Sequence, residues 1–422
     1  MTVARARLPV PGAGAALTML QTVSVTTVGV LPAFLLGALA VQIRADLHLG
    51  PADIGLAAAA LFAVAGVLAR PAGHFVQRIG AGRGMMLCAL FAAVSLAGVG
   101  LAPSFPVLLA ALIVGGVANG LAQPAANLSI SRAIGPGILG LAFGIKQSSI
   151  PAASILGGLA VPGIALVFGW RWAFLIGAGA AVGIAAWAFL SSPPSRMLSA
   201  NDEHPPDRGT PRAGLLVLTI GAGLASAAAT SIGVFLVDSA VQSGLKPGSA
   251  GLLFAGAALL GLVVRIGLGG AMDRFHARSP YVLIANLLII GAVGYLLLGI
   301  GNTPFFVVGA LLAYSGGWTW PGLVHFAVVR DNRLAAASAT GFLQTGLSLG
   351  AAAGPLVFGF LVEATSYRTA WLAAGAAALI AAATFRIGRR MIRASRGLPV
   401  RGMLLRGIRH RPEYQSNTKE RQ

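Results

Sequence analysis

One lysine lies inside a long apolar stretch, where an ammonium group needs compensation. Lys146 stands about nine residues into the apolar run 137–167, roughly 14 Å along a helix that rises about 1.5 Å per residue. No Asp or Glu lies at the centre of any apolar run in this sequence. A charge at that depth is costly unless an anion, several carbonyls and hydroxyls, or loss of the proton compensates it. We favour an anionic ligand for Lys146 over a purely structural role.

Amide side chains supply further candidates for the same site. The run 106–130 carries three amides four residues apart, which places them on one face of a helix; they are Asn119, Gln123 and Asn127. Such a stripe indicates either a cavity wall or amide pairing between packed helices. Gln147 follows Lys146 and recurs as Gln344. Both could contact a ligand or close hydrogen bonds between helices.

Aromatic residues and a histidine form a second stripe in the run 304–329. Tyr314 and Trp318 lie about one turn apart and could stack on a planar or apolar ligand, with helix packing or an interfacial belt as the alternative. His325, two turns further on, could titrate. Because it lies near the end of its run, a structural hydrogen bond is the alternative for His325.

Polar side chains nearer the ends of the apolar runs are weaker candidates. Gln21 and Thr26 lie in the first run, 16–42, and hydroxyls in apolar helices usually bond backbone carbonyls. Arg70 and Arg265 lie near the ends of their runs, so we expect their side chains to extend toward lipid headgroups. Lys146 is then the only basic residue expected near the middle of the membrane.

Catalytic and metal-binding constellations are missing from the sequence. The remaining histidines are scattered through predicted loops and tails: His48, His74, His204, His276 and His410. They form no ligand cluster with metal spacing, no nucleophile–histidine–acid set and no phosphate-binding loop. We therefore expect no enzyme activity, no bound metal and no cofactor.

The elements that carry these residues are long apolar helices. Hydrophobic residues make up 56% of the 422 and charged residues 10%, whereas a soluble domain carries about 25% charge. Runs of about 20 residues or more cross a hydrocarbon core of about 30 Å as helices. We expect an all-α membrane protein with twelve transmembrane helices at 16–42, 54–72, 85–103, 106–130, 137–167, 172–192, 213–241, 250–270, 281–300, 304–329, 335–362 and 368–387.

The second six runs repeat the first six. Pro51, Gly55, Gly73 and Arg78 recur 196 residues later as Pro247, Gly251, Gly269 and Arg274. Gly120, Pro124, Gly144, Gln147, Gly157 and Arg171 recur 197 residues later as Gly317, Pro321, Gly341, Gln344, Gly354 and Arg368. A duplication of six helices is typical of secondary transporters. The predicted parts are an N-terminal segment 1–15, a six-helix bundle 16–192, a linker 193–212, a second bundle 213–387 and a basic tail 388–422.

Positive charges predict which side of the membrane holds the termini. An even number of spans places both termini on one side, and most of the 30 Lys and Arg residues fall on that side. The opposite side has only Arg44, Arg171, Lys246 and Arg368. Because cytoplasmic loops collect Lys and Arg, we expect both termini to be cytoplasmic. The net charge of +19 then reflects contact with anionic membrane lipids and not nucleic-acid binding.

The loops after the second and eighth runs carry one motif twice. The sequence reads Gly-His-Phe-Val-Gln-Arg from Gly73 to Arg78 and Gly-Gly-Ala-Met-Asp-Arg from Gly269 to Arg274. This pattern, with twelve spans, resembles the Gly-x-x-x-Asp-Arg signature of the major facilitator superfamily. Gln77 replaces the Asp of that signature in the first copy. The resemblance implies a conformational latch between the bundles, formed by Gly73, Gln77, Arg78, Gly269, Asp273 and Arg274.

The resemblance implies a secondary transporter of the cytoplasmic membrane that works by alternating access. We expect a monomer that binds a small-molecule substrate, with a coupling proton, and three functions compete. The first is transport of a small organic anion such as a carboxylate, at a midplane site containing Lys146. The second is efflux of drugs or hydrophobic metabolites. The Gly-Pro of the drug-antiporter motif is missing before Gly157-Gly158 and present only in the second half, at Gly354-Pro355. The third, a non-transporting receptor, is less favoured.

Overall fold

A computed structural model of the chain describes residues 13–133, 144–191, 212–274, 279–332 and 336–395. These residues form helices and turns without any strand. The helices of the first half are α1 Ala13–Ala38, α2 Ala40–Leu47, α3 Pro51–Ile79, α4 Ala81–Gly100, α5 Phe105–Ala133, α7 Ser149–Ala160, the π-helix η2 Val161–Ala165, α8 Leu166–Phe168 and α9 Trp170–Leu190. Those of the second half are α10 Arg212–Gln242, α11 Pro247–Arg274, α12 Pro280–Ile300, α13 Thr303–Gly317, α14 Pro321–Asp331, α15 Ala336–Ala364 and α16 Tyr367–Ser395.

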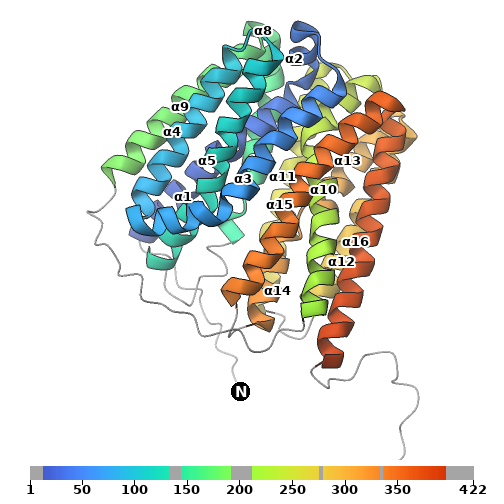
Figure 1. The fold of residues 1–422 in the computed structure, drawn as a ribbon. Coiled ribbons are helices and arrows are strands. Elements are labelled where there is room, and N and C mark those ends of the chain that lie inside the picture. The colour runs from blue at the N-terminus through green and yellow to red at the C-terminus, as the bar shows by residue number, and fades with distance from the viewer. Residues whose placement is uncertain (1–12, 134–143, 192–211, 275–278, 333–335, 396–422) are drawn as a thin grey trace, which may run out of the picture.

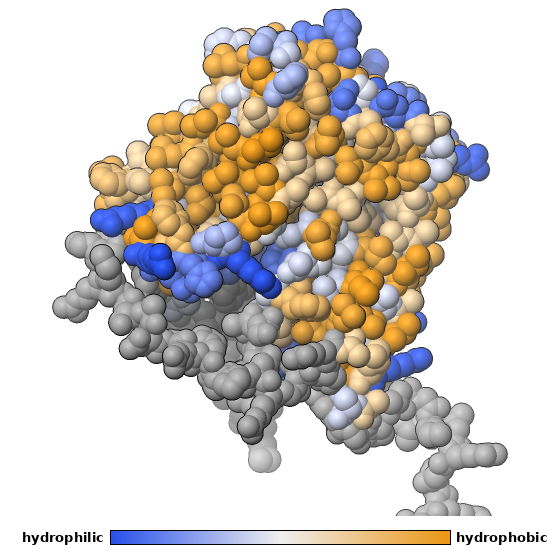
Figure 2. Space-filling view, viewed as in Figure 1, coloured by the Kyte–Doolittle hydropathy of each residue, from blue (hydrophilic) through white to orange (hydrophobic). Residues whose placement is uncertain are grey.

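Most predicted spans are continuous helices. Eleven helices in the described part of the chain are long and apolar enough to cross a membrane. Leu, Val, Ile and Phe side chains are exposed along them, and the face in Figure 2 is largely hydrophobic, with hydrophilic residues toward its two ends. Exposure of so many apolar side chains to water would be unfavourable, so this hydrophobic surface is the part of the protein that faces lipid.

Two of the predicted spans are interrupted. The run 304–329 is divided into α13 and α14, which are separated at Trp318–Trp320 and are 15 and 11 residues long. The run 137–167 contains a turn at Gln147–Ser148 before α7 and the π-helix η2 after it. Helices interrupted inside the membrane are where transporters commonly place their binding sites. At the chain end, α16 continues to Ser395, beyond the predicted end of the last span at 387.

The two halves contact each other mainly at three helix pairs among the described residues: α3 with α15, α7 with α11, and α1 with α10. Figure 1 shows the halves close together near α2 and spread apart toward the end of α14. We call these two ends of the molecule the α2 side and the α14 side.

Residues of the sequence repeat form two of the crossings. A Cβ atom on Gly251 of α11 would lie 2.6 Å from the carbonyl oxygen of Gly158 in α7. In the repeat-related pair, a Cβ atom on Gly55 of α3 would collide with the carbonyl oxygen of Pro355 in α15. Only glycine permits backbones to approach this closely. The two contacts are therefore related by the same duplication that the sequence shows.

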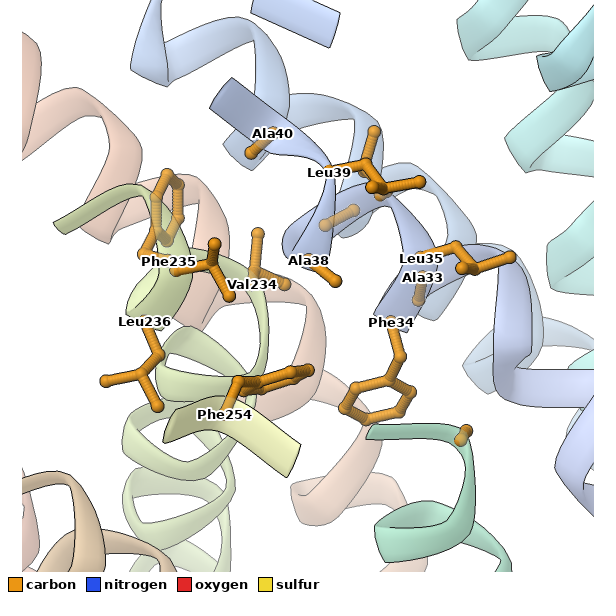
Figure 3. Packing of buried hydrophobic residues seen from close by; sticks show 14 of the residues in the cluster. Ala33, Phe34, Leu35, Ala38, Leu39, Ala40, Val234, Phe235, Leu236 and Phe254 are labelled. Atoms are coloured by element: carbon orange, nitrogen blue, oxygen red, sulfur yellow. The ribbon is translucent and has the colours of Figure 1, made fainter. Parts of the chain in front are cut away.

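Buried apolar clusters show where the halves meet. The largest cluster combines residues of both halves, among them Phe34 and Ala38 of α1, Val234 and Phe235 of α10, and Phe254 of α11, and Figure 3 shows these side chains close together. Two further large clusters each lie within one half, one among α1, α3, α4, α5 and α9 and the other among α10, α12, α14, α15 and α16. The dry contact between the halves thus lies toward the α2 side.

Candidate functional site

Polar side chains close the α2 side around one carboxylate. Arg44 of α2 donates to Asp238 of α10 at 2.5 Å, and the hydroxyl of Tyr367 in α16 donates to the same carboxylate oxygen. The side chain of Asp238 is only 5% exposed, so this ion pair is largely desolvated and breaking it is costly. None of these three residues was predicted to belong to a functional site. The only signal was an acidic residue at the end of a predicted span.

A second contact on the α2 side uses a helix N-terminus. The carboxylate of Glu363 in α15 accepts the backbone N–H of Ala52 at 3.0 Å, in the first turn of α3. Asp53 accepts the backbone N–H of Gly50 at 2.9 Å and so caps the same helix end. Negative charge stabilises the N-terminus of a helix through its exposed N–H groups and dipole. Glu363 therefore ties the second half to the start of α3.

A further ion pair on the α2 side lies within the first half and, unlike the Arg44–Asp238 pair, is exposed to solvent. Arg171 donates to the carboxylate of Asp46, and the indole of Trp170 donates to it at 3.3 Å. The hydrogen bond from Arg171 holds the pKa of Asp46 below its usual value. Both side chains are more than a third exposed, so solvent screens this pair and it contributes little to stability.

Lys146 lies just before α7 and is held by the amide stripe of α5. Its ammonium donates to the side-chain oxygens of Gln123 and, at 2.7 Å, of Asn127. The lysine is 3% exposed, whereas Asn127 is exposed. The structure thus brings the buried lysine and the amide stripe of α5 together. Both amides are neutral, so they solvate the ammonium without neutralising its charge.

His325 and Gln344 bring the second half to the same region. The imidazole Nδ1 of His325 lies 2.7 Å from the carbonyl oxygen of Pro321 in the first turn of α14. Gln344 of α15 and the ammonium of Lys146 both interact electrostatically with the imidazole. The amide of Gln344 also lies 3.4 Å from the hydroxyl of Ser348. Candidates from both halves therefore face each other near Lys146.

The expectation for Arg265 was wrong. This residue is 6% exposed and does not extend to the headgroups. Its guanidinium donates to the backbone carbonyls of Gln147, at 2.5 Å, and of Trp318. Carbonyls at helix interruptions lack intrahelical partners and can therefore hold a cation inside the protein. Lys146 is accordingly not the only basic residue in the interior.

Tyr314 and Trp318 stack on each other, with ring centroids 5.3 Å apart. Trp318 also packs on Phe34 of the first half, and Tyr314 packs edge-on against Phe254 of α11. The two rings are 2% and 6% exposed. In this conformation they form part of the contact between the halves. A ligand could stack on them only after that contact has opened.

Several predicted site residues lie elsewhere or make other contacts. Gln21 donates to the hydroxyl of Ser191 within the first half, at 2.8 Å. The hydroxyl of Thr26 donates to the backbone carbonyl of Thr22 in its own helix, as hydroxyls in apolar helices commonly do. Asn119 is half-buried, one turn before Gln123 on α5. None of these contacts connects Gln21, Thr26 or Asn119 with Lys146.

The predicted latch is only partly described. Gln77 and Arg78 are exposed in the last turn of α3, and a Cβ atom on Gly73 would meet no other atom within 4 Å. The backbone of α11 extends through Gly269, Asp273 and Arg274. The side chains of these second-copy residues lie outside the described residues. Among the described residues, Gly73, Gln77 and Arg78 of the first copy are thus not closely packed.

Comparisons with known proteins agree with this architecture. The profile of the Major Facilitator Superfamily matches residues 17–333 and 218–412, whereas no curated protein matches the sequence. A bacterial homologue of the human lysosomal transporter Spinster, inward-facing and unoccupied, is 16% identical with a TM-score of 0.73, covering 92% of this chain and 99% of its own. Its occupied inward-facing form is 17% identical with a TM-score of 0.71 and the same coverage. A mutant of the nucleoside transporter NupG is 15% identical with a TM-score of 0.68, covering 88% and 99%.

The family match spans well over half of the sequence, and the fold of these structures extends over nearly all of it. This chain belongs to the Major Facilitator Superfamily and is a multi-pass membrane transporter, not an enzyme.

Proposed function

We propose that this chain transports a small organic anion, such as a carboxylate, across the cytoplasmic membrane by alternating access. The supporting observation is the setting of Lys146, whose buried ammonium is held by the neutral amide oxygens of Gln123 and Asn127. Both amides are neutral, and the positively charged ammonium lies in a region of low dielectric constant. A carboxylate that entered this region would offset the charge of Lys146. The ion pair between them would compensate the cost of removing the carboxylate from water.

The proposed binding site lies between the halves, where candidates of both come together. Lys146, Gln123 and Asn127 belong to the first half, and His325 and Gln344 to the second. An anion held by both halves would interact differently with them as they rock. That difference is what allows a ligand to shift the equilibrium between conformations. The further ligand contacts that we propose are Gln147, Asn119, Gln21, Thr26, Tyr314 and Trp318.

We infer that the α14 side faces the cytoplasm and that the conformation is inward-facing. The predicted cytoplasmic arginines Arg70 and Arg78 are exposed at the end of α3, as the positive-inside rule requires for that side. Two of the four predicted outer residues, Arg44 and Arg171, form ion pairs on the α2 side. Both termini are then cytoplasmic, and the transporter works as a monomer surrounded by lipid.

A coupling proton has a candidate carrier in His325. Its imidazole interacts electrostatically with the ammonium of Lys146, so its protonation would disfavour the charged lysine unless an anion were bound. Proton and anion would therefore bind together, as symport requires. In the outward-facing state, we propose that the motif residues Gly73, Gln77, Arg78, Gly269, Asp273 and Arg274 close the cytoplasmic side.

Replacing Lys146 tests this proposal. Lys146→Gln keeps a polar side chain and removes the charge, so it should weaken anion binding by more than tenfold, about 1.4 kcal/mol. The protein should still fold, because the change deletes a buried charge. Binding is measured by the thermal stabilisation of purified protein with acetate, lactate, benzoate or succinate, and transport by uptake of the same labelled anions into liposomes.

Arg70→Gln is the matched control, since it removes an exposed arginine and should leave binding unchanged. A Lys146→Gln protein that bound and transported these anions like the wild type would contradict the proposal. An unresponsive wild-type protein would exclude these carboxylates as substrates.

A further inference from the structure

A single guanidinium joins the two helix interruptions of this fold. Arg265 of α11 donates from Nη1 to the carbonyl of Gln147 and from Nη2 to the carbonyl of Trp318. Gln147 lies in the turn before α7, in the first half, and Trp318 follows α13 in the second. The hydrogen bond to Gln147 therefore bridges the two halves, whereas the one to Trp318 lies within the second half. Both carbonyls belong to segments whose regular helix is interrupted.

These two hydrogen bonds do not occupy every N–H donor of the Arg265 guanidinium. Its Nε is buried and has no hydrogen-bond partner among the described residues. A guanidinium has five donors in a planar fork that matches the two oxygens of a carboxylate. Arginine–carboxylate pairs are also frequently bidentate, and the carboxylate offsets the charge of the guanidinium, which a neutral carbonyl does not. An anion would therefore compete with the two carbonyls for Arg265.

Space for an anion is missing in the present conformation. A cavity of about 10 Å³ adjoins Arg265, and its wall is formed by Ile150, Pro151, Gly261, Tyr314, Trp318 and Thr319. This volume suffices for about one water molecule and not for a carboxylate. An anion could reach the guanidinium only if the carbonyls of Gln147 and Trp318 moved away from it.

We propose that Arg265 is a second anion-binding residue, which exchanges the carbonyls of Gln147 and Trp318 for the carboxylate of the transported anion. This inference rests on the proposed anion transport and adds a residue and a step to it. Gln147 is the neighbour of Lys146, so an anion held by Lys146 lies next to the segment that Arg265 binds. The exchange removes a bond between α11 and the other half. Binding of the anion would thereby favour separation of the halves at this crossing.

The test uses a cysteine that reports the contact between the halves. Val234 is 2% exposed and lies against Gly37 where α10 crosses α1, so Val234→Cys in a Cys88→Ser background should react slowly with a hydrophilic maleimide. The rate is measured on full-length purified protein, alone and with acetate, lactate, benzoate or succinate. Arg265→Gln, Arg265→Lys and the control Arg70→Gln are compared, and their thermal unfolding is recorded to confirm that each is folded.

We expect the anion to accelerate labelling of the reporter protein with Arg265 intact. Arg265→Gln should label more than tenfold faster without any anion and show no further acceleration with it. Arg265→Lys keeps the charge and should retain part of the anion response, and Arg70→Gln should behave like the parent. Arg265→Gln that labels at the parental rate, or that still responds fully to the anion, would overturn the inference while leaving anion transport intact. A parent protein that responds to none of the four anions would instead exclude these carboxylates as substrates, and would overturn the exchange for them as well.

Discussion

Arg44 of α2 and Asp238 of α10 form a largely buried ion pair, 2.5 Å long, that joins the two halves of the transporter. The two residues are not repeat-related, so the duplication did not create this contact. It adds charge to a contact that is otherwise made by apolar side chains and glycine crossings. Because Tyr367 donates to the same carboxylate, three helices converge on one acidic group. We infer that this ion pair, together with Tyr367, holds the α2 side closed.

Breaking this pair should loosen the α2 side. Asp238→Asn removes the negative charge and leaves Arg44 facing a neutral amide, at a cost of about 2 kcal/mol, or roughly 30-fold in the equilibrium between closed and open forms. The rate of maleimide labelling at Val234→Cys, in the Cys88→Ser background, should rise accordingly.

Asp46→Asn is the matched control for that prediction. It breaks the exposed pair with Arg171 inside the first half, and labelling at Val234→Cys should not change. Equal effects of the two substitutions would show that Asp238 does not hold the halves together.

Close helix crossing should make Gly251 intolerant of any side chain. Gly251→Ala places a Cβ atom 2.6 Å from the Gly158 carbonyl oxygen and from Val161 Cβ, so α7 and α11 must move apart at a cost of about 1–3 kcal/mol. Uptake into liposomes should fall severalfold or more. Gly256→Ala on the same helix meets no atom within 4 Å and should preserve uptake. Normal uptake by Gly251→Ala would mean that the closed crossing is not part of the transport cycle.

The proposed orientation in the membrane predicts a labelling pattern. In a Cys88→Ser background, Ser104→Cys and Asn302→Cys, both exposed on short connections, should react with an impermeant thiol reagent in intact cells. Ser199→Cys, in the segment between the two halves, should react only after the cells are opened. The reverse pattern would invert the topology and make the α14 side external.

Efflux of hydrophobic compounds is the alternative that a dye assay can separate from anion transport. An efflux pump lowers dye accumulation in energised cells, and loss of the stacking surface in Trp318→Ala would abolish that effect. We expect dye levels to be the same with and without this protein. A Trp318-dependent decrease in dye would favour the efflux function.

The amino-acid sequence by itself determined the membrane class, the duplicated helices and the candidates around Lys146. These features follow from hydropathy, spacing and charge, which act locally along each helix. The amide stripe at Gln123 and Asn127 was recognisable because residues four apart share a helix face whatever the helix packs against.

Only the tertiary structure decided which side chains meet across the halves. Arg265 lies near the predicted end of its span, so its sequence position favours lipid headgroups, and it turns inward only because two helix interruptions offer it carbonyls. Asp238 and Arg44 are 194 residues apart, and no local pattern relates them. Their contact depends on the rotation and depth of α2 and α10, which glycine crossings and apolar packing set over the whole molecule.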